Sequence, residues 1–144
     1  MEFELVRGTN ESCYLYGSVY LAANYICDTL EFGSNIVLPD GVYYLALGKD
    51  ESKNETVVLI YDFMQNRVSK LVRNNTYMYK EIKMRRETND ICIGTKIMQP
   101  LLTNDEYAAK MIIHYIHGAQ NIGEIVTLTI KTPHKLLKTF VHVQ

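Results

Sequence analysis

Cys92, His114 and His117 carry the side chains best suited to nucleophilic or acid–base chemistry. A thiol becomes a nucleophile when a base takes its proton, and amides beside it, which Gly94 could help to form, stabilise the oxyanion. No base is near Cys92 in sequence, so a histidine from elsewhere in the fold would have to supply it. Cys92 equally suits a buried strand end, where a thiol behaves as a small hydrophobic group. The three residues are therefore named as candidates for catalysis, but the sequence leads us to expect no catalytic site.

His114 and His117 are three residues apart in a segment with helical periodicity. Two histidines at this spacing can bind a metal when further ligands join them, but no HExxH pattern surrounds them. Both fall in the last turn of the expected helix, where the helix dipole favours an imidazolium. The sequence therefore predicts a capping role for them, no metal site and no cofactor.

Charge divides the chain into an acidic and a basic part. Residues 1–62 hold ten acids and three bases, whereas residues 67–86 hold seven bases and one acid. The basic part with its tyrosines is the candidate binding surface: Arg67, Lys70, Arg73, Tyr77, Tyr79, Lys80, Lys83, Arg85 and Arg86. Three interpretations stay open: a solvated face, contact with an acidic protein partner or another copy of the chain, or contact with a nucleic-acid backbone.

These residues need a scaffold, and 144 residues suffice for one domain. We expect a mainly β (β+α) protein, an antiparallel sheet or small barrel with one packed α-helix at about 104–117. The helix is indicated by a capping box, Thr103 to Glu106, and by Gly118 as a left-handed cap. The simplest arrangement is an antiparallel meander. The expected strands are residues 3–7, 12–21, 24–30, 42–47, 56–63, 68–72, 124–131 and 138–143.

The domain is expected to span residues 1–131. A C-terminal extension, residues 132–144, follows it, and we expect this extension to form a strand that binds a partner by adding to the edge of the partner's sheet.

Three cysteines, with no close pair, indicate neither a disulfide framework nor a zinc site. The acidic N-terminus does not resemble a signal peptide, and no apolar run approaches a membrane span. We expect cytoplasmic synthesis, with incorporation into a virion as one destination. A net charge of -1 argues against bulk attraction to nucleic acid or membrane.

Several short motifs resemble an uncharacterised domain family of bacteria and their phages. Residues 26–31 are similar to its CDTLE strand and turn, residues 38–43 to its IPxGxY turn, and residues 92–94 to a shortened GCILVG segment. Residues 124–130 resemble its closing EITLTI strand. The resemblance covers roughly residues 3–131 and implies the same β scaffold.

Typical members place an IHxGN stretch before the GCI segment, similar to the His and Cys of cysteine-dependent peptidoglycan transpeptidases. The corresponding residues 82–90 hold neither His nor Gly, and Ile91 replaces the Gly before Cys92. All four histidines lie after Cys92. Without an imidazole, a thiol of ordinary pKa, about 8.5, is only a few per cent thiolate at neutral pH. The resemblance therefore implies a member that has lost this machinery.

The sequence favours a non-enzymatic structural or assembly module, a phage virion or accessory protein acting through protein–protein contacts. Its eleven tyrosines suit such contacts, because Tyr supplies large amphipathic area at modest entropy cost. Its partners would be other proteins or copies of itself, and no small-molecule substrate is identified. The alternative is a cysteine-dependent peptidoglycan-modifying enzyme, transpeptidase-like or hydrolytic, with Cys92 as nucleophile and His114 or His117 as base.

Overall fold

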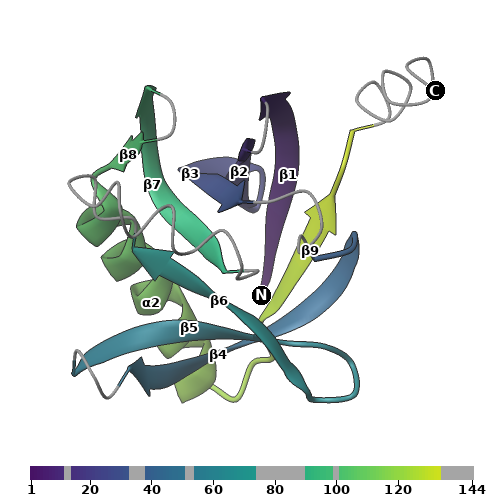
Figure 1. Cartoon of the computed structure of the whole chain (residues 1–144). Helices are drawn as coiled ribbons and strands as arrows, with labels where there is room; N and C mark the ends of the chain where they lie inside the picture. Colours follow the sequence, from purple (N-terminus) through teal and green to yellow (C-terminus); the bar gives the residue numbers. More distant parts are fainter. Residues whose placement is uncertain (12–13, 33–37, 51–53, 74–89, 99–100, 134–144) are drawn as a thin grey trace.

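The computed structural model describes residues 1–11, 14–32, 38–50, 54–73, 90–98 and 101–133. These ranges contain nine strands and helix α2 (Figure 1). The strands are β1 (Glu2–Glu11), β2 (Tyr14–Leu21), β3 (Asn24–Phe32), β4 (Gly41–Asp50), β5 (Glu55–Tyr61), β6 (Arg67–Arg73), β7 (Ile91–Met98), β8 (Leu101–Thr103) and β9 (Thr127–Lys131). Helix α2 spans Asp105–Asn121. The predicted strand 138–143 and most of the extension lie outside the described residues.

Eight strands form a closed barrel. Their order is β3-β2-β1-β9-β4-β5-β6-β7, and β7 pairs back onto β3 to close the ring, while β8 is added to β7 alone. The expectation of a mainly β protein with a small barrel and a packed helix is confirmed. The simple antiparallel meander is wrong, because β1 pairs with β9 and β6 pairs with β7 in parallel. Parallel neighbours require long connections, and α2 lies on the connection that brings β9 beside β1.

The predicted strands of the first half are found with small shifts at their ends, but β7 and β8 were not predicted as a hairpin. Residues 91–94 of β7 are all buried, because one face lines the barrel and the other lies under β8. A strand buried on both faces lacks the alternation of polar and apolar residues that reveals strands in a sequence.

The helix begins within one residue of its predicted start at 104, but the predicted capping box and the predicted C-terminal end need correction. Thr103 belongs to β8 and pairs with Thr95, and the N-cap residue Asn104 makes no side-chain capping hydrogen bond, so the capping box does not form. The helix continues past Gly118 to Asn121, and Gly123 is the left-handed residue, with φ of 72°. The amide of Gly123 donates to the Gln120 carbonyl and that of Glu124 to the Ala119 carbonyl, which is the Schellman pattern of a helix end.

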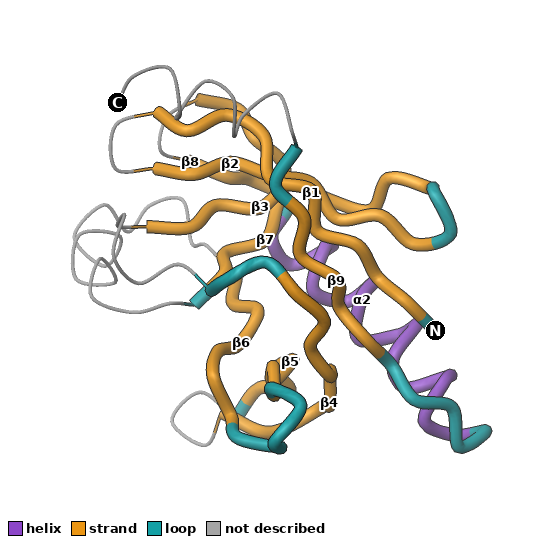
Figure 2. Tube along the Cα trace, turned by 90° about the vertical axis from the view of Figure 1, so that its right-hand side faces the viewer, coloured by secondary structure: helices purple, strands orange, loops and turns teal. Residues whose placement is uncertain are grey.

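Inward-facing side chains of the strands and one stripe of α2 form the main core. Phe3 and Leu5 of β1 lie opposite Leu128 and Ile130 of β9, and alternate residues of the other strands continue this layer. Helix α2 contacts β3, β4, β5, β6 and β7, so it closes one opening of the barrel rather than following one strand (Figure 2). Its stripe in this core is Ala108, Ile112, Ile116 and Ala119.

Candidate functional site

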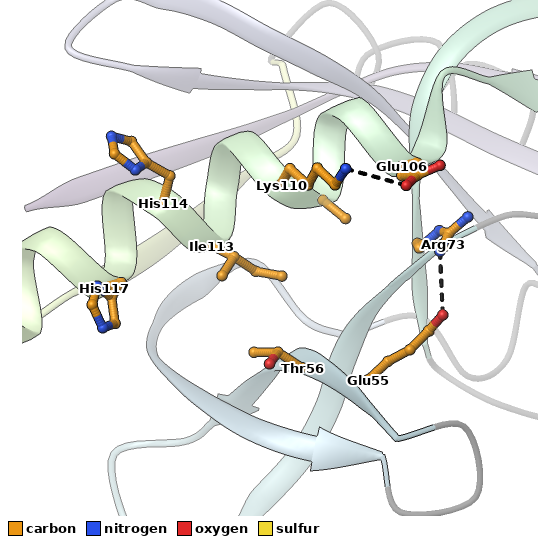
Figure 3. A pocket seen from close by; sticks show the side chains of 9 residues that line it. Glu55, Thr56, Arg73, Glu106, Lys110, Ile113, His114 and His117 are labelled. Atoms are coloured by element: carbon orange, nitrogen blue, oxygen red, sulfur yellow. Dashed lines mark hydrogen bonds and ion pairs between the residues drawn. The ribbon is translucent and has the colours of Figure 1, made fainter.

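Helix α2, β5 and β6 border a groove of about 450 Å³ that brings together three of the predicted site residues: Arg73, His114 and His117. Figure 3 shows Arg73 and Glu55 on one side of the groove and the side chains of α2 on the other. The two imidazole rings point away from each other. Among the described residues, no three His, Cys, Asp or Glu side chains are grouped to hold a metal ion.

The charges of this groove are arranged in pairs. Arg73 lies 3.2 Å from a carboxylate oxygen of Glu55 through Nη1, and 3.2 Å from Asp105 through Nε. Lys110 lies 3.2 Å from Glu106 on the same helix (Figure 3). Exposed ion pairs of this kind contribute little to stability, about 0–1 kcal/mol. They do balance the cations, so the groove presents no strongly charged surface to a ligand.

The predicted capping role of the histidines is wrong, because α2 extends beyond both of them. Its last turn carries no basic residue. His117 Nδ1 instead lies 3.5 Å from the side-chain nitrogen Nδ2 of Asn121, and the His114 ring meets Tyr115 edge-on at 5.9 Å between centroids. The helix dipole acts within the last turn, so it does not explain either histidine.

Cys92 lies away from the histidines, in a second apolar cluster on the outer face of β7. Its exposed fraction is 1 %, and it packs with Tyr16, Leu30 and Leu102. Successive side chains of a strand point to opposite faces, and Ile91 and Ile93 are the ones that face the core shared with α2. The structure therefore does not bring Cys92 together with His114 or His117, both of which are exposed.

Gly94, the residue considered for an oxyanion-binding amide, allows β8 to pack closely. A Cβ at this position would lie 2.7 Å from the Thr103 carbonyl oxygen and 2.9 Å from Leu102 Cβ. The glycine is required because another part of the backbone occupies the place of a side chain. This requirement explains the residue without any catalytic role.

Only the first part of the predicted basic surface lies within the described residues. Arg67 is exposed at the start of β6, Lys70 is half-buried, and Arg73 is paired in the groove. The remaining members, Tyr77, Tyr79, Lys80, Lys83, Arg85 and Arg86, lie outside the described residues. The three described cations lie along β6.

A hollow of about 510 Å³ on the outer face of β4 and β5 was not predicted. Tyr44, Tyr61, Phe63, Gln65 and Ile125 line it. Phe63 is 79 % exposed, its neighbour Met64 68 %, and Ile125 69 %. We call Tyr44, Tyr61, Phe63, Met64 and Ile125 the apolar surface. A signal was present in the sequence: Phe63 and Met64 stand in the short connection between two strands, where polar turn residues are usual.

The motifs behind the family resemblance form part of the scaffold. Glu31 binds Arg7 inside the barrel, and the more exposed Asp40, in the turn before β4, also binds Arg7. Asp28 accepts hydrogen bonds from the Ser18 hydroxyl at 3.2 Å and from the Lys96 amide at 2.8 Å, which links β2, β3 and β7. These polar residues are therefore accounted for by contacts that hold strands and turns together.

Comparison of the chain with models of known families, with curated proteins and with solved structures finds no match. Within the described residues, no helix is long and apolar enough to cross a membrane. The fold defines the class, a small closed mixed β-barrel with a helix over one opening.

Proposed function

We propose that this chain is a non-enzymatic structural or assembly module that acts through protein–protein contacts. The apolar surface is the observation that carries the proposal. The largest apolar patch on a soluble monomer typically measures about 300–600 Å² and often marks a binding site. Aromatic residues and Met are enriched in protein interfaces, and four of the five members of the apolar surface are of these types.

The closed barrel also favours contacts through a face. Strand addition requires a free edge, and each of the eight strands in the ring has a neighbouring strand on both sides. The outer edge of β8 has no neighbour among the described strands, but β8 is only three residues long. A partner that binds the described part of the chain is therefore expected to cover side chains.

A phage virion or accessory protein is the setting that we propose, because of the motif resemblance to a family of bacteria and their phages. Glu31, Asp40 and Gly94 belong to those motifs, and each has a structural role here. Motif residues that serve the fold suit a module that keeps the family's β scaffold and has no catalytic role.

The test is the native mass of the protein in the cells that produce it. We expect the tagged wild-type chain to be recovered in a defined assembly well above 16.6 kDa. Phe63→Ser should release the free chain, because it removes the most exposed apolar side chain of the surface. Tyr107→Ser is the matched control, since Tyr107 is 66 % exposed on α2, outside the apolar surface. Recovery of the wild type as a free chain would contradict the proposal.

A further inference from the structure

We infer that the partner of the apolar surface is a second copy of this chain, placed by a two-fold axis that runs along the strands. The inference rests on the proposed function and names the partner. A two-fold interface requires one surface to be complementary to itself. The apolar surface meets this requirement, because it holds a projecting side chain, a hollow beside it and polar groups at both rims.

The projecting part is the turn between β5 and β6. Asp62 Oδ1 accepts hydrogen bonds from the amides of Met64 and Asn66, each at 2.9 Å. The Asp62 amide donates to the Asn66 carbonyl at 3.0 Å, and Gln65 adopts a left-handed φ of 65°. The turn is thus ordered by its own contacts while Phe63 and Met64 face solvent. Binding through a preorganised element loses little conformational entropy.

The receiving part is the hollow of about 510 Å³ beside this turn. Its floor is a row of paired residues that crosses three neighbouring strands. Tyr44 of β4 pairs with Tyr61 of β5 on one side and with Thr127 of β9 on the other. A volume of several hundred Å³ is in the range of sites that enclose small ligands, so a phenyl ring fits easily. A two-fold axis places Phe63 of each copy in the hollow of the other.

One rim carries an exposed cation, and the other carries a partly exposed carboxylate that is paired with the Met1 ammonium. Arg67 pairs with Tyr61 across β5 and β6, so it lies on the β6 side of the row, and it is exposed. Glu124, next to Ile125 on the β9 side, binds the Met1 ammonium and is still 41 % exposed. Rotation about an axis along the strands brings the Arg67 rim of one copy to the Glu124 rim of the other. Rim charges of this kind steer association and fix the register.

The apolar area is sufficient for such an interface. With about 150–250 Å² for each large side chain, the exposed fractions of four members of the apolar surface correspond to roughly 500 Å²: Tyr44, Phe63, Met64 and Ile125. A stable interface covers about 800 Å² of each partner, with an apolar centre and a polar rim. The apolar surface and its two charged rims together approach that size.

Sedimentation equilibrium of the purified chain over a range of concentrations tests the inference. We expect a mass of twice 16.6 kDa for the wild type at high concentration. Phe63→Ser should raise the dissociation constant by roughly 30-fold or more, as for a central interface residue, whereas Tyr107→Ser should leave it unchanged. Arg67→Glu should raise it by a smaller factor. Circular dichroism checks that each variant is folded, and Ile125→Ser replaces Phe63→Ser if that variant is not.

A wild-type chain that stays at 16.6 kDa at every concentration overturns the inference, and so does a dimer that Phe63→Ser leaves intact. Different outcomes contradict the second copy as the partner and the assembly role itself. A purified monomer that still enters a Phe63-dependent assembly in its native cells contradicts only the second copy as the partner. A chain that is free in those cells contradicts the assembly role itself.

Discussion

The guanidinium of Arg7 binds both carboxylate oxygens of Glu31 inside the barrel, at 3.1 Å through Nε and 2.8 Å through Nη2. Their side chains are only 5 % and 3 % exposed. Burial lowers the pKa of the Arg7 guanidinium, but its hydrogen bonds and charge interactions with Glu31 and Asp40 outweigh that effect and raise it. The Leu38 carbonyl, at 2.6 Å from Nη2, completes the contacts. The pair joins β1, β3 and the turn before β4.

Removing one member of this pair should be strongly destabilising. Glu31→Ala leaves a buried guanidinium with only part of its contacts, and losses of about 3–5 kcal/mol are typical for a broken buried pair. Urea unfolding of the variant measures the loss. The double variant Arg7→Met/Glu31→Met should recover much of it, because no buried charge remains. A Glu31→Ala variant as stable as the wild type would show that the pair does not hold the barrel.

The Cys27 thiol should make stability depend on pH in the alkaline range. Burial, and secondly the Asp28 carboxylate, raise its pKa to about 12. The folded state therefore retains the proton more tightly than the unfolded chain, whose thiol has a pKa of about 8.5. The stability that this provides is complete below that value and is lost as pH rises toward 12. In Cys27→Ala the free energy of unfolding should fall less between those values. Urea unfolding of the wild type and of Cys27→Ala at both ends of this pH range measures the difference. An equal fall in the free energy of unfolding for the two proteins would contradict the prediction.

Two glycines near the end of α2 should respond in opposite directions to alanine. Gly118 lies inside the helix with nothing within 4 Å of an added Cβ, so Gly118→Ala should stabilise by about 0.5–1 kcal/mol. Gly123 has a φ of 72°, which is strained for alanine, so Gly123→Ala should destabilise by about 1 kcal/mol. Thermal unfolding of the two variants measures both effects. If Gly118→Ala destabilised the protein and Gly123→Ala stabilised it, the helix would end at Gly118.

Gly94→Ala should destabilise the β7–β8 hairpin by about 1–3 kcal/mol, the cost of forcing atoms into a packed region. Gly8→Ala is the control, since the nearest atom to its added Cβ, the Tyr16 carbonyl oxygen, lies at 3.6 Å. Urea unfolding compares the two. Equal urea midpoints for Gly94→Ala and the wild type would mean that β8 does not pack against residue 94.

Native alkylation distinguishes the assembly module from the cysteine enzyme. Cys27 and Cys92 are 2 % and 1 % exposed, so a thiol reagent should modify both slowly in the folded protein and rapidly in denaturant. Mass spectrometry of digested samples measures each rate. Modification of Cys92 much faster than Cys27, together with loss of peptidoglycan activity in Cys92→Ser, would support the enzyme instead.

The apolar surface shows why the candidate site was only partly predictable. Phe63 and Met64 stand out in the sequence as apolar residues in a turn. Their neighbour Ile125 is 62 residues away from Phe63 in the chain and joins them because β9 lies beside β4. Charge counts along residues 67–86 likewise did not reveal that Arg73 is paired with Glu55 and Asp105. Pairing depends on distances in space that linear spacing does not contain.

Alternating apolar residues such as Phe3 and Leu5, and the helical stripe of Ala108 and Ile112, were sufficient to predict a sheet or small barrel with one packed helix. These signals are local, because side-chain direction follows the period of each element. Only the tertiary structure decided where α2 ends, that β9 runs parallel to β1, and that Arg7 meets Glu31 within the core. The parallel pairing and the buried ion pair depend on closure of the barrel, which joins strands distant in sequence, whereas the end of α2 depends on the hydrogen bonds made where the chain leaves the helix at Gly123.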